Sequence, residues 1–569
     1  MPSGTRNPSS EVLDRARRWR DHDPDPRTRA EIDALLARRS PELSERFAGP
    51  PEFGTAGLRA PLGAGESRMN LATVIRTSAG LARWLVSRVE RPRVVVGCDA
   101  RHGSAEFARA AAQVLAAAGC EVLALPPRQP TPVTAYAVRE LACEAGVMIT
   151  ASHNPPRDNG YKVYLGGRAV DSDEARGVQL IAPADAQIAR EIAAVGHADE
   201  VPRASEGVTE LGGEIVERYA RRVVAALPSA GTRPGGDDAV ARRDLPIVVT
   251  AMHGVGGDLL ARVLREAGFA SVTPVAAQQR PDPDFPTVEF PNPEEPGALD
   301  LAYAAATEAG ARLVLALDPD ADRCAVAIPD GRGGWIRLSG DRVGALLGED
   351  AARRLGPGGG TLACSVVSSR LLERIAHRHG LGFAPTLTGF KWIGRVPGLA
   401  FGYEEAIGYC TDPQAVRDKD GISACLRVAE LAARCDLRAL GERIDAAYGC
   451  YRTRPLTVRV DSPEEARAAI RRLLDHPPAR LAGAQVCEVA DLGAGYRGLP
   501  ATPGAVLRTE DEDRVILRPS GTEPKLKCYV EAIRPERAQA LDRLDALCAQ
   551  VAGLLGVGEA RNPHNDGQG

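Results

Sequence analysis

The chain has 569 residues, a length that predicts roughly four compact units at about 150 residues each and excludes a small disulfide-stapled module. Hydrophobic residues make up 44% of the chain and charged residues 26%, enough to build and cover several cores, which argues against wholesale disorder. Lys and Arg total 71 against 75 Asp and Glu, and the formal charge of -4 offers no basic field for a nucleic-acid partner.

Twelve cysteines are scattered singly, without a CxxC pair or a His-rich neighbourhood, so neither a zinc site nor a disulfide framework is supported. The first residues lack a cationic end followed by an apolar stretch, and no segment approaches the ~18 apolar residues of a membrane helix. We therefore expect a protein of the reducing cytoplasm, with free thiols and no membrane partner.

Residues 1–50 are predicted to form polar helices. Thr28 and Glu31 have the spacing of a capping box and precede apolar residues at helical spacing. A Ser-Pro pair at 40–41 predicts the start of a second short helix. We expect this helical extension to pack on the first domain.

From about residue 90 the pattern changes to short β-branched runs, small-residue turns and Ala/Leu-rich helical stretches, which indicates α/β units. Three times a strand and a helix are followed by a later strand that ends in a polar loop. These later strands and loops lie at 147–156, 313–323 and 399–408. The repetition predicts three related α/β domains.

Linkers rich in turn-forming residues divide the chain. We expect them at 228–246, near 337–341 and near 448–455. The predicted domains are domain 1 at 51–235, domain 2 at 236–340, domain 3 at 341–450 and domain 4 at 451–569. Domain 4 is predicted to contain strands and two amphipathic helices, and its end, RNPHNDGQG, to form a frayed, disordered tail.

The loop TASHNPPRDNGYKVY at 150–164 follows an apolar strand and contains Ser152 beside His153. A nucleophile at a strand end, on a loop stiffened by two prolines, is a suitable catalytic placement. The alternative is a structural Asx/Pro turn. Because no GxSxG motif is present, an α/β-hydrolase is disfavoured.

The loop DPDADR follows the next such strand and carries three aspartates at a spacing of two, namely Asp318, Asp320 and Asp322. In an extended chain this spacing turns all three carboxylates to one side, where hard oxygens suit Mg²⁺. A solvated acidic turn is the alternative, although three close acids repel one another without a cation. An EF-hand is excluded, because Arg323 and Pro329 occupy the positions of its Gly and Glu.

Three further loops offer groups for a sugar phosphate. Glu404 and Glu405 at a strand end can accept hydrogen bonds from hydroxyls, or can simply begin a helix. RPSGTEPK at 518–525 combines an arginine fork, two hydroxyls and a glycine, which suits a phosphate but also a plain Ser-Gly turn. FGTAGLR at 53–59 adds Arg59 as another phosphate fork. We expect all these loops to converge on one cleft.

On these motifs the chain resembles an α-D-phosphohexomutase of the long phosphoglucomutase/phosphomannomutase branch, which also includes phosphopentomutases. The resemblance covers nearly the whole chain, through FGTAGLR, TASHNPPRDNGYKVY, DPDADR, TGFKWIG, GYEEAIG, RDKDG and RPSGTEPK in order. It implies a heart-shaped four-domain fold, with three similar α/β domains and a smaller α+β C-terminal domain around a central cleft.

The resemblance implies that Ser152 carries a phosphoryl group and that Mg²⁺ is held by its phosphate with Asp318, Asp320 and Asp322. Lys162 is the implied proton-transferring residue, with His153 orienting the serine and Arg59 nearby. The implied substrate-binding residues are Thr55, Arg323, Lys391, Glu404, Lys419, Arg518, Ser520, Gly521 and Thr522. Lys419 is also a candidate second acid/base.

The implied reaction is that of a phosphoglucomutase, which interconverts glucose 1-phosphate and glucose 6-phosphate through glucose 1,6-bisphosphate as intermediate and activator. Many hexomutases have Glu-x-Ser in the sugar loop, whereas Ala406 stands here, and Gly408 replaces a histidine of the phosphomannomutase branch. Mannose and pentose phosphates therefore remain alternative substrates.

Two alternatives of other classes stay open, a sugar phosphatase and a non-catalytic sugar-phosphate binder. A phosphatase is disfavoured because DPDAD lacks the DxDx[TV] ending. We expect a monomer or weak dimer with a small-molecule partner. The preferred sugar and the resting phosphorylation of Ser152 are not readable from the sequence.

Overall fold

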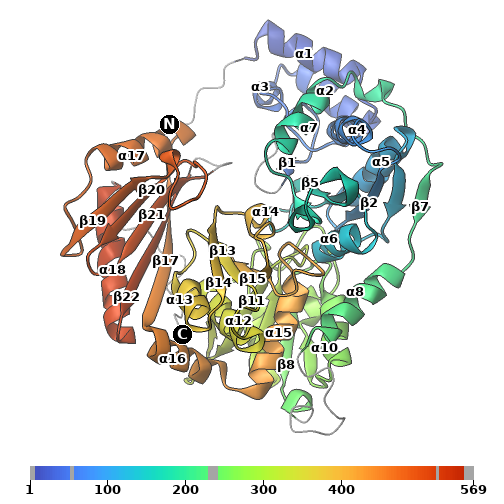
Figure 1. The fold of residues 1–569 in the computed structure, drawn as a ribbon. Helices are drawn as coiled ribbons and strands as arrows, with labels where there is room; N and C mark the ends of the chain where they lie inside the picture. The colour runs from blue at the N-terminus through green and yellow to red at the C-terminus, as the bar shows by residue number, and fades with distance from the viewer. Residues whose placement is uncertain (1–6, 52–56, 228–240, 521–524, 556–569) are drawn as a thin grey trace.

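The computed structural model describes residues 7–51, 57–227, 241–520 and 525–555. Figure 1 shows four α/β or α+β bodies in an arc, from the N-terminal domain at upper right to the C-terminal domain at left. Within these ranges, no helix has the length and apolar character needed to cross a membrane.

Three helices precede the first sheet: α1 (Ser10–Asp21), α2 (Pro26–Ala37) and α3 (Glu42–Arg46). The predicted capping box is wrong, because α2 begins before Thr28. Asp25 is the N-cap, its side chain accepts from the Arg27 backbone N–H at 2.9 Å, and Pro26 has the fixed φ that suits a first helical residue. Thr28 instead donates its hydroxyl hydrogen to Asp23.

The helical extension contacts the first domain through charged side chains. Arg27 forms an ion pair with Glu106 at 2.6 Å, and the Glu31 carboxylate accepts from the Ala64 backbone N–H at 2.9 Å. Glu31 is therefore used in a contact between elements, not in a helix cap.

The first sheet has seven strands in the order β1-β5-β4-β2-β3-β7, with β6 added to β5. The strands are β1 (Leu58–Pro61), β2 (Arg93–Cys98), β3 (Glu121–Ala124), β4 (Ala145–Ile149), β5 (Asp158–Leu165), β6 (Val178–Gln179) and β7 (Val208–Glu210). The helices are α4 (Leu71–Val86), α5 (Ser104–Ala117), α6 (Thr131–Glu140), α7 (Ala184–Ala193) and α8 (Glu214–Ala225).

The second sheet has the order β12-β11-β10-β8-β9. Its elements are β8 (Ile247–Thr250), α10 (Gly257–Glu266), β9 (Val272–Pro274), α11 (Asp300–Glu308), β10 (Leu313–Leu317), β11 (Cys324–Pro329) and β12 (Trp335–Arg337). A long segment between β9 and α11 contains the turn that carries Glu294.

The third sheet has the order β14-β13-β15-β16. Its strands are β13 (Thr361–Ser365), β14 (Gly382–Thr386), β15 (Leu399–Glu404) and β16 (Gly408–Cys410). Its helices are α12 (Gly340–Leu355), α13 (Leu371–Arg378), α14 (Phe390–Ile393), α15 (Gly421–Arg434) and α16 (Leu437–Tyr448). One hydrophobic cluster runs from the first domain through the third, so these three domains share a core.

The fourth sheet is antiparallel throughout, in the order β17-β22-β21-β20-β19-β18, and has a hydrophobic core of its own. Its elements are β17 (Cys450–Arg459), α17 (Pro463–Asp475), β18 (Arg480–Leu481), β19 (Ala484–Asp491), β20 (Ala505–Thr509), β21 (Arg514–Pro519), β22 (Lys525–Arg534) and α18 (Arg537–Leu554). The expected tail RNPHNDGQG lies outside the described residues.

The first three sheets repeat one topology, which confirms the three related α/β domains. In each, the first strand (β2, β8 or β13) lies between the second and third strands and is parallel to both, and a fourth strand (β5, β11 or β16) returns antiparallel to the third. The polar loops around 152, 320 and 405 all join the third strand to the fourth. They are therefore structurally equivalent, at the carboxyl ends of parallel strands where ligands commonly bind.

Candidate active site

Ser152 lies in the loop that follows β4. Its φ of 53° lies in the left-handed region, which is uncommon for a non-glycine residue and marks a constrained turn. Its backbone N–H donates to Thr150 Oγ1 at 2.9 Å. Its Oγ donates to Asp318 Oδ2 at 2.8 Å and lies 3.1 Å from His153 Nδ1. The serine of domain 1 thus meets the acidic loop of domain 2.

Arg101, which follows β2, holds the backbone of the serine loop. Its Nη2 donates to the carbonyls of Ser152 and Asn154, both at 2.6 Å, and its Nη1 donates to those of Pro155 and Asp158 at 2.8 and 3.1 Å. The guanidinium also lies over the ring of Phe285 from domain 2, at 5.1 Å. One buried side chain therefore fixes the path of four loop residues.

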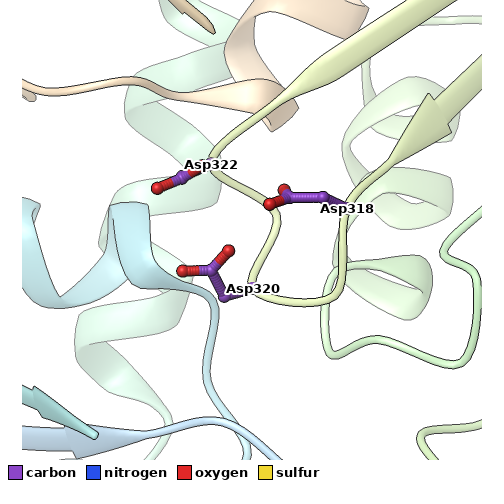
Figure 2. A group of neighbouring side chains, drawn as sticks. All are labelled: Asp318, Asp320 and Asp322. Atoms are coloured by element: carbon purple, nitrogen blue, oxygen red, sulfur yellow. The ribbon is translucent and has the colours of Figure 1, made fainter. Parts of the chain in front are cut away.

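Asp318, Asp320 and Asp322 form one buried cluster in the β10–β11 loop, and each offers an oxygen within 4.8 Å of the others. Figure 2 shows the three carboxylates gathered beside this short loop. Ala321, at its turn, has a φ of 60°, which lets the chain reverse between the second and third aspartates. The predicted acidic cluster therefore exists as one group of side chains.

One oxygen of Asp320 and one oxygen of Asp322 interact closely with protein groups, while the second oxygen of each accepts no hydrogen bond among the described residues. Asp320 Oδ2 accepts from Thr131 Oγ1 at 2.6 Å and from Lys162 Nζ at 2.7 Å. Asp322 Oδ2 lies 2.9 Å from Lys162 Nζ and 3.1 Å from Lys419 Nζ. Among the described residues, the buried oxygens Asp320 Oδ1 and Asp322 Oδ1 have no hydrogen-bond partner.

The charges around this cluster are unevenly balanced. Burial and the neighbouring carboxylates raise the pKa of Asp318 well above its ordinary value. Burial also acts to raise the pKa of Asp320, but Lys162 outweighs it and lowers that pKa. Lys162 and Lys419 thus pair with Asp320 and Asp322, and Arg323 Nε lies 3.9 Å from Asp322 Oδ1.

A divalent cation fits this donor set. Buried carboxylate oxygens without a partner are costly, and hard oxygens are the ligands that Mg²⁺ prefers. The free Oδ1 atoms of Asp320 and Asp322, with Asp318 beside Ser152, supply such ligands. The burial of all three side chains disfavours the alternative of a solvated acidic turn.

Two arginines approach the cluster from different domains. Arg59 on β1 donates to Asn154 Oδ1 at 3.2 Å, and Arg323 lies 3.6 Å from the Glu294 carboxylate. In the part of the chain that the structure describes, the buried Nε groups of both arginines have no hydrogen-bond partner. An Nε–H group without a hydrogen bond, on an arginine beside a nucleophile, is available to donate to a phosphate.

The surroundings of His153 disfavour its charged form. Burial and then the charge of Arg323 hold the pKa of its imidazole well below its ordinary value. A neutral ring beside Ser152 Oγ can exchange a hydrogen bond with the hydroxyl without adding charge.

Glu404 ends β15 and is buried. Its Oε1 accepts from the Gly389 backbone N–H at 2.5 Å, and burial, followed by the charge of Glu405, raises its pKa to about 7. Gly408 makes room for the side chain of Lys419, because a Cβ at position 408 would come within 2.3 Å of Lys419 Cδ. The lysine side chain therefore occupies the space that a side chain at 408 would need.

The loop of domain 4 that is predicted to bind phosphate begins at the end of β21. Arg518 donates to Thr388 of domain 3, and the Ser520 backbone N–H donates to the Lys525 carbonyl at 2.8 Å. Three residues of the predicted site, Thr55, Gly521 and Thr522, lie outside the described residues.

Lys391 is one of the predicted site residues that the structure does not bring into contact with the aspartates. It is half-buried on α14, and burial lowers its pKa while the charge of Asp185 acts to raise it. Over the described ranges, no ion pair or hydrogen bond joins its ammonium to the aspartate cluster.

Sequence reasoning missed three side chains of this site, namely Arg101, Thr131 and Glu294. Arg101 lies in the turn DARHGS, directly after a predicted strand. Polar residues after predicted strands identified the other loops, so the same pattern could have identified Arg101. Thr131 is separated from Asp320 by 189 residues, and no spacing in the sequence predicts their contact.

Three equivalent α/β domains and a fourth antiparallel domain, with a serine loop, an aspartate loop and a phosphate-binding loop, define the architecture of the α-D-phosphohexomutases. Family models for phosphoglucomutase/phosphomannomutase match the chain in order: α/β/α domain I at 50–190, domain II at 224–332, domain III at 339–451 and the C-terminal domain at 458–546. The chain belongs to the phosphoglucomutase/phosphomannomutase family, and it is a phosphomutase, an isomerase.

Individual relatives cover most of the chain. A probable phosphomannomutase of Haemophilus influenzae is 42% identical over 471 residues, which span 82% of this chain and 93% of that protein. A phosphopentomutase of Mus musculus is 34% identical over 567 residues, spanning 91% and 89%. The crystal structure of a putative phosphomannomutase from Thermus thermophilus is 26% identical, with a TM-score of 0.67 over 89% of this chain and 99% of that one.

Proposed function

We propose that this protein is a Mg²⁺-dependent phosphoglucomutase that interconverts glucose 1-phosphate and glucose 6-phosphate through a phosphorylated Ser152. The observation that carries the proposal is the hydrogen bond of 2.8 Å between Ser152 Oγ and Asp318. It joins a nucleophile on domain 1 to a carboxylate cluster on domain 2, and phosphoryl transfer needs this combination.

In the proposed reaction, phosphorylated Ser152 gives its phosphoryl group to the free hydroxyl of the sugar phosphate. The bond from phosphorus to Ser152 Oγ breaks as the bond to the sugar oxygen forms, the attacking hydroxyl loses its proton and Ser152 Oγ regains one, which produces glucose 1,6-bisphosphate. The bisphosphate turns end for end, and its other phosphoryl group returns to Ser152. Water must be excluded throughout, because hydrolysis would remove the phosphoryl group.

Asp318, Asp320 and Asp322, with the phosphorylated Ser152, would hold Mg²⁺. When bound, this ion neutralises charge on the transferring phosphoryl group. Lys162, whose Nζ lies 2.7 Å from Asp320, would move the proton at the transferring oxygen. Burial acts to lower its pKa, but Asp320 and Asp322 raise it, so the residue holds a proton to deliver.

Arg59 and Arg323 would contact the phosphoryl groups near the metal. Arg518, Ser520, Gly521 and Thr522 would clamp the phosphate that is not being transferred, and Thr55 would also bind the substrate. Glu404 would accept hydrogen bonds from the sugar hydroxyls. Lys391 and Lys419 would face the substrate from domain 3, with Lys419 as the second candidate acid/base.

A pentose or mannose phosphate is the second candidate substrate. Ala406 cannot donate the hydroxyl hydrogen bond of a serine, and Lys419 occupies the space beside Gly408. The relatives named above act, by their names, on mannose and pentose phosphates. These observations favour a relaxed or different sugar preference.

The test is a coupled assay primed with glucose 1,6-bisphosphate, with glucose, mannose, glucosamine and ribose 1-phosphates compared side by side. The proposal expects the highest kcat/KM for glucose 1-phosphate. Ser152→Ala should lower turnover at least ~10³-fold, because it removes the nucleophile. Near-wild-type turnover by this variant would contradict the phosphoserine, and phosphate release in proportion to substrate consumed would favour a phosphatase.

A further inference from the structure

The segment of domain 3 that carries Lys419 is packed against the aspartate loop of domain 2. Lys419 stands between two aspartates, directly before α15. The backbone N–H of Gly421 donates to the carbonyl of Ala321 at 3.1 Å. A Cβ at position 421 would come within 2.3 Å of the Arg323 carbonyl oxygen, so only glycine allows this close approach.

Asp418, the residue before Lys419, divides its two oxygens between domain 1 and the lysine. Its Oδ2 accepts from Tyr164 OH at 2.8 Å and from Gln179 Nε2 at 2.7 Å. Its Oδ1 accepts from the backbone N–H of Lys419 at 2.8 Å and lies 3.5 Å from the Nζ of that lysine. Because only 1% of Asp418 is exposed, these groups rather than water compensate its charge.

The two donors from domain 1 lie opposite each other in its sheet. Tyr164 on β5 pairs with Gln179 on β6, and both side chains are buried. Burial, followed by the charge of Asp418, raises the pKa of Tyr164 well above its ordinary value, so the hydroxyl keeps the hydrogen that it donates. Asp418 is therefore bound to strands of domain 1 and not to a loop.

Strand β5 also carries Lys162. Lys162 and Tyr164 are two residues apart on this strand and so lie on the same face of the sheet. The Nζ atoms of Lys162 and Lys419 lie 2.9 and 3.1 Å from the same oxygen, Asp322 Oδ2. Strand β5 therefore reaches one carboxylate by two routes, directly through Lys162 and indirectly through Asp418.

The remaining contacts of Lys419 confine its aliphatic stem. Its Nζ lies 5.4 Å from the centroid of the Phe390 ring, and its Cδ fills the space beside Gly408. Over the described ranges, the ion pairs of its ammonium are with Asp418 and Asp322. The ammonium thus depends on these two carboxylates for its position.

We infer that Asp418 is a positioning residue for Lys419, because its bonds to the sheet of domain 1 hold the ammonium of that lysine at the aspartate loop. The inference rests on the proposed function, in which Lys419 faces the substrate. Both phosphoryl transfers of the proposed reaction take place at Ser152, so a lysine held here serves both orientations of the bisphosphate. Displacing such a group by about 1 Å can lower the rate ~10²-fold.

The chain offers a matched control for this anchor. Tyr219 on α8 is also fully buried, and its hydroxyl donates to Asp420 Oδ1 at 2.7 Å. Asp420 is the N-cap of α15, and in the part of the chain that the structure describes its carboxylate forms no hydrogen bond or ion pair with Lys419. Tyr164→Phe and Tyr219→Phe each remove one hydroxyl between domains 1 and 3, but only the first acts on Asp418.

The first measurement is kcat and KM in the coupled assay, with the sugar 1-phosphate that the wild type uses best. We expect Asp418→Asn to lower kcat ~10²-fold and Tyr164→Phe ~10-fold, with KM within ~3-fold of the wild type. Tyr219→Phe should leave kcat near the wild-type value, although both tyrosine variants should lower the Tm by a similar amount. Equal values of kcat in the two tyrosine variants would overturn the inference.

A double-mutant cycle separates positioning of the lysine from stability of the domain contact. If Asp418 acts through Lys419, Asp418→Asn should lower the residual single-turnover rate of Lys419→Met by less than ~2-fold. A loss of ~10²-fold in that background would overturn the inference, because Asp418 would then act without the lysine.

Labelling of lysines tests the anchor without catalysis. The chain has five lysines, namely Lys162, Lys391, Lys419, Lys525 and Lys527. Their acetylation by an amine-reactive ester can therefore be followed one by one by mass spectrometry of the folded protein. The rate at Lys419 should rise ~10-fold in Asp418→Asn and by less in Tyr164→Phe, while Lys391 and the Tyr219→Phe variant show wild-type rates.

An unchanged labelling rate at Lys419 in both Asp418→Asn and Tyr164→Phe would overturn the inference. Should Asp418→Asn fail to fold, Tyr164→Phe carries both measurements, since it keeps the charge of Asp418. A wild-type protein inactive on every sugar phosphate would contradict the proposed function instead, and the labelling rates would then test the anchor by themselves.

Discussion

At the scale of single residues, the aspartate cluster gives one oxygen of Asp320 to the protein and leaves another for the proposed cation. Asp320 Oδ2 is saturated by Thr131 and Lys162, while Asp320 Oδ1 is buried without a partner among the described residues. Partners of this kind orient a ligand and raise metal affinity without touching the ion. Thr131 is therefore expected to act on Mg²⁺ through Asp320.

We expect Thr131→Val to weaken Mg²⁺ binding by about 10- to 100-fold, because the Asp320 carboxylate loses the hydroxyl that fixes its orientation. Calorimetric titration with Mg²⁺ measures the affinity directly, and Mg²⁺ activation of turnover should shift in parallel. Thr134→Val is the matched control, since Thr134 lies one turn along α6 and its hydroxyl contacts Met148 instead. Equal Mg²⁺ affinities in the two variants would contradict this role.

The raised pKa of Glu404 predicts that kcat/KM and the stability of the fold depend on pH. Burial raises its pKa from 4.5 to about 7, and only the ionised carboxylate accepts hydrogen bonds with both oxygens. We therefore expect kcat/KM to rise with pH through about 7 and then level off. The carboxyl group stabilises the fold while it is protonated, so its contribution to the free energy of unfolding falls as the pH rises from about 4.5 to 7.

Glu404→Gln should remove this rise while the titration of the substrate phosphate remains in both profiles. The pH profiles of kcat/KM and of Tm, recorded for wild type and variant, measure both effects. A wild-type rise that persists unchanged in Glu404→Gln would assign the titration to another group.

At the scale of elements, the loops between third and fourth strands carry residues of the proposed active site. Each has one non-glycine residue with positive φ, namely Ser152, Ala321 and Ile407. Such backbone strain persists only where surrounding contacts hold it. For the serine loop, these contacts come from the Arg101 guanidinium at the end of the adjacent strand.

Arg101→Lys should lower the rate of phosphoryl transfer ~10²-fold, because an ammonium cannot reach all four loop carbonyls and Ser152 then loses its fixed position. Single-turnover transfer from the phosphorylated enzyme to glucose 1-phosphate measures this step. Arg93→Lys is a suitable control, since Arg93 begins the same strand and pairs with Glu121 away from the loop. Equal transfer rates in the two variants would show that the hydrogen bonds from Arg101 to the loop carbonyls are not needed for phosphoryl transfer.

Much of this arrangement was predictable from local sequence. The three strand-loop units and the acidic spacing of DPDAD depend on residues close together in the chain, and the structure contains both. The predicted capping box is wrong because the side chains of Thr28 and Glu31 bind groups outside the start of α2. The contacts of Thr131 with Asp320 and of Arg101 with the serine loop depend on how sheets and domains meet, which spacing does not encode.

At the scale of the whole molecule, the four domains would supply different parts of the proposed reaction. Domains 1 and 2 bring Ser152 and the aspartates together, domain 3 presents Glu404, and domain 4 presents Arg518. Positive and negative side chains of the site nearly cancel in the total charge of the chain. The near-neutral total charge therefore gave no sign of a phosphate ligand. Two lysines and several arginines face three aspartates locally, although the chain carries a net charge of only -4.

The central claim is that Ser152 carries the phosphoryl group that passes to the sugar. The enzyme is first incubated with glucose 1,6-bisphosphate, and its intact mass is measured. Glucose 1-phosphate is then added, and the mass is measured again, which tests the claim directly. We expect one phosphoryl group on Ser152 and its complete transfer to the sugar, at a rate no slower than kcat. A protein that gains no phosphoryl group, or that loses it to water at the same rate without sugar, would contradict the proposed mechanism.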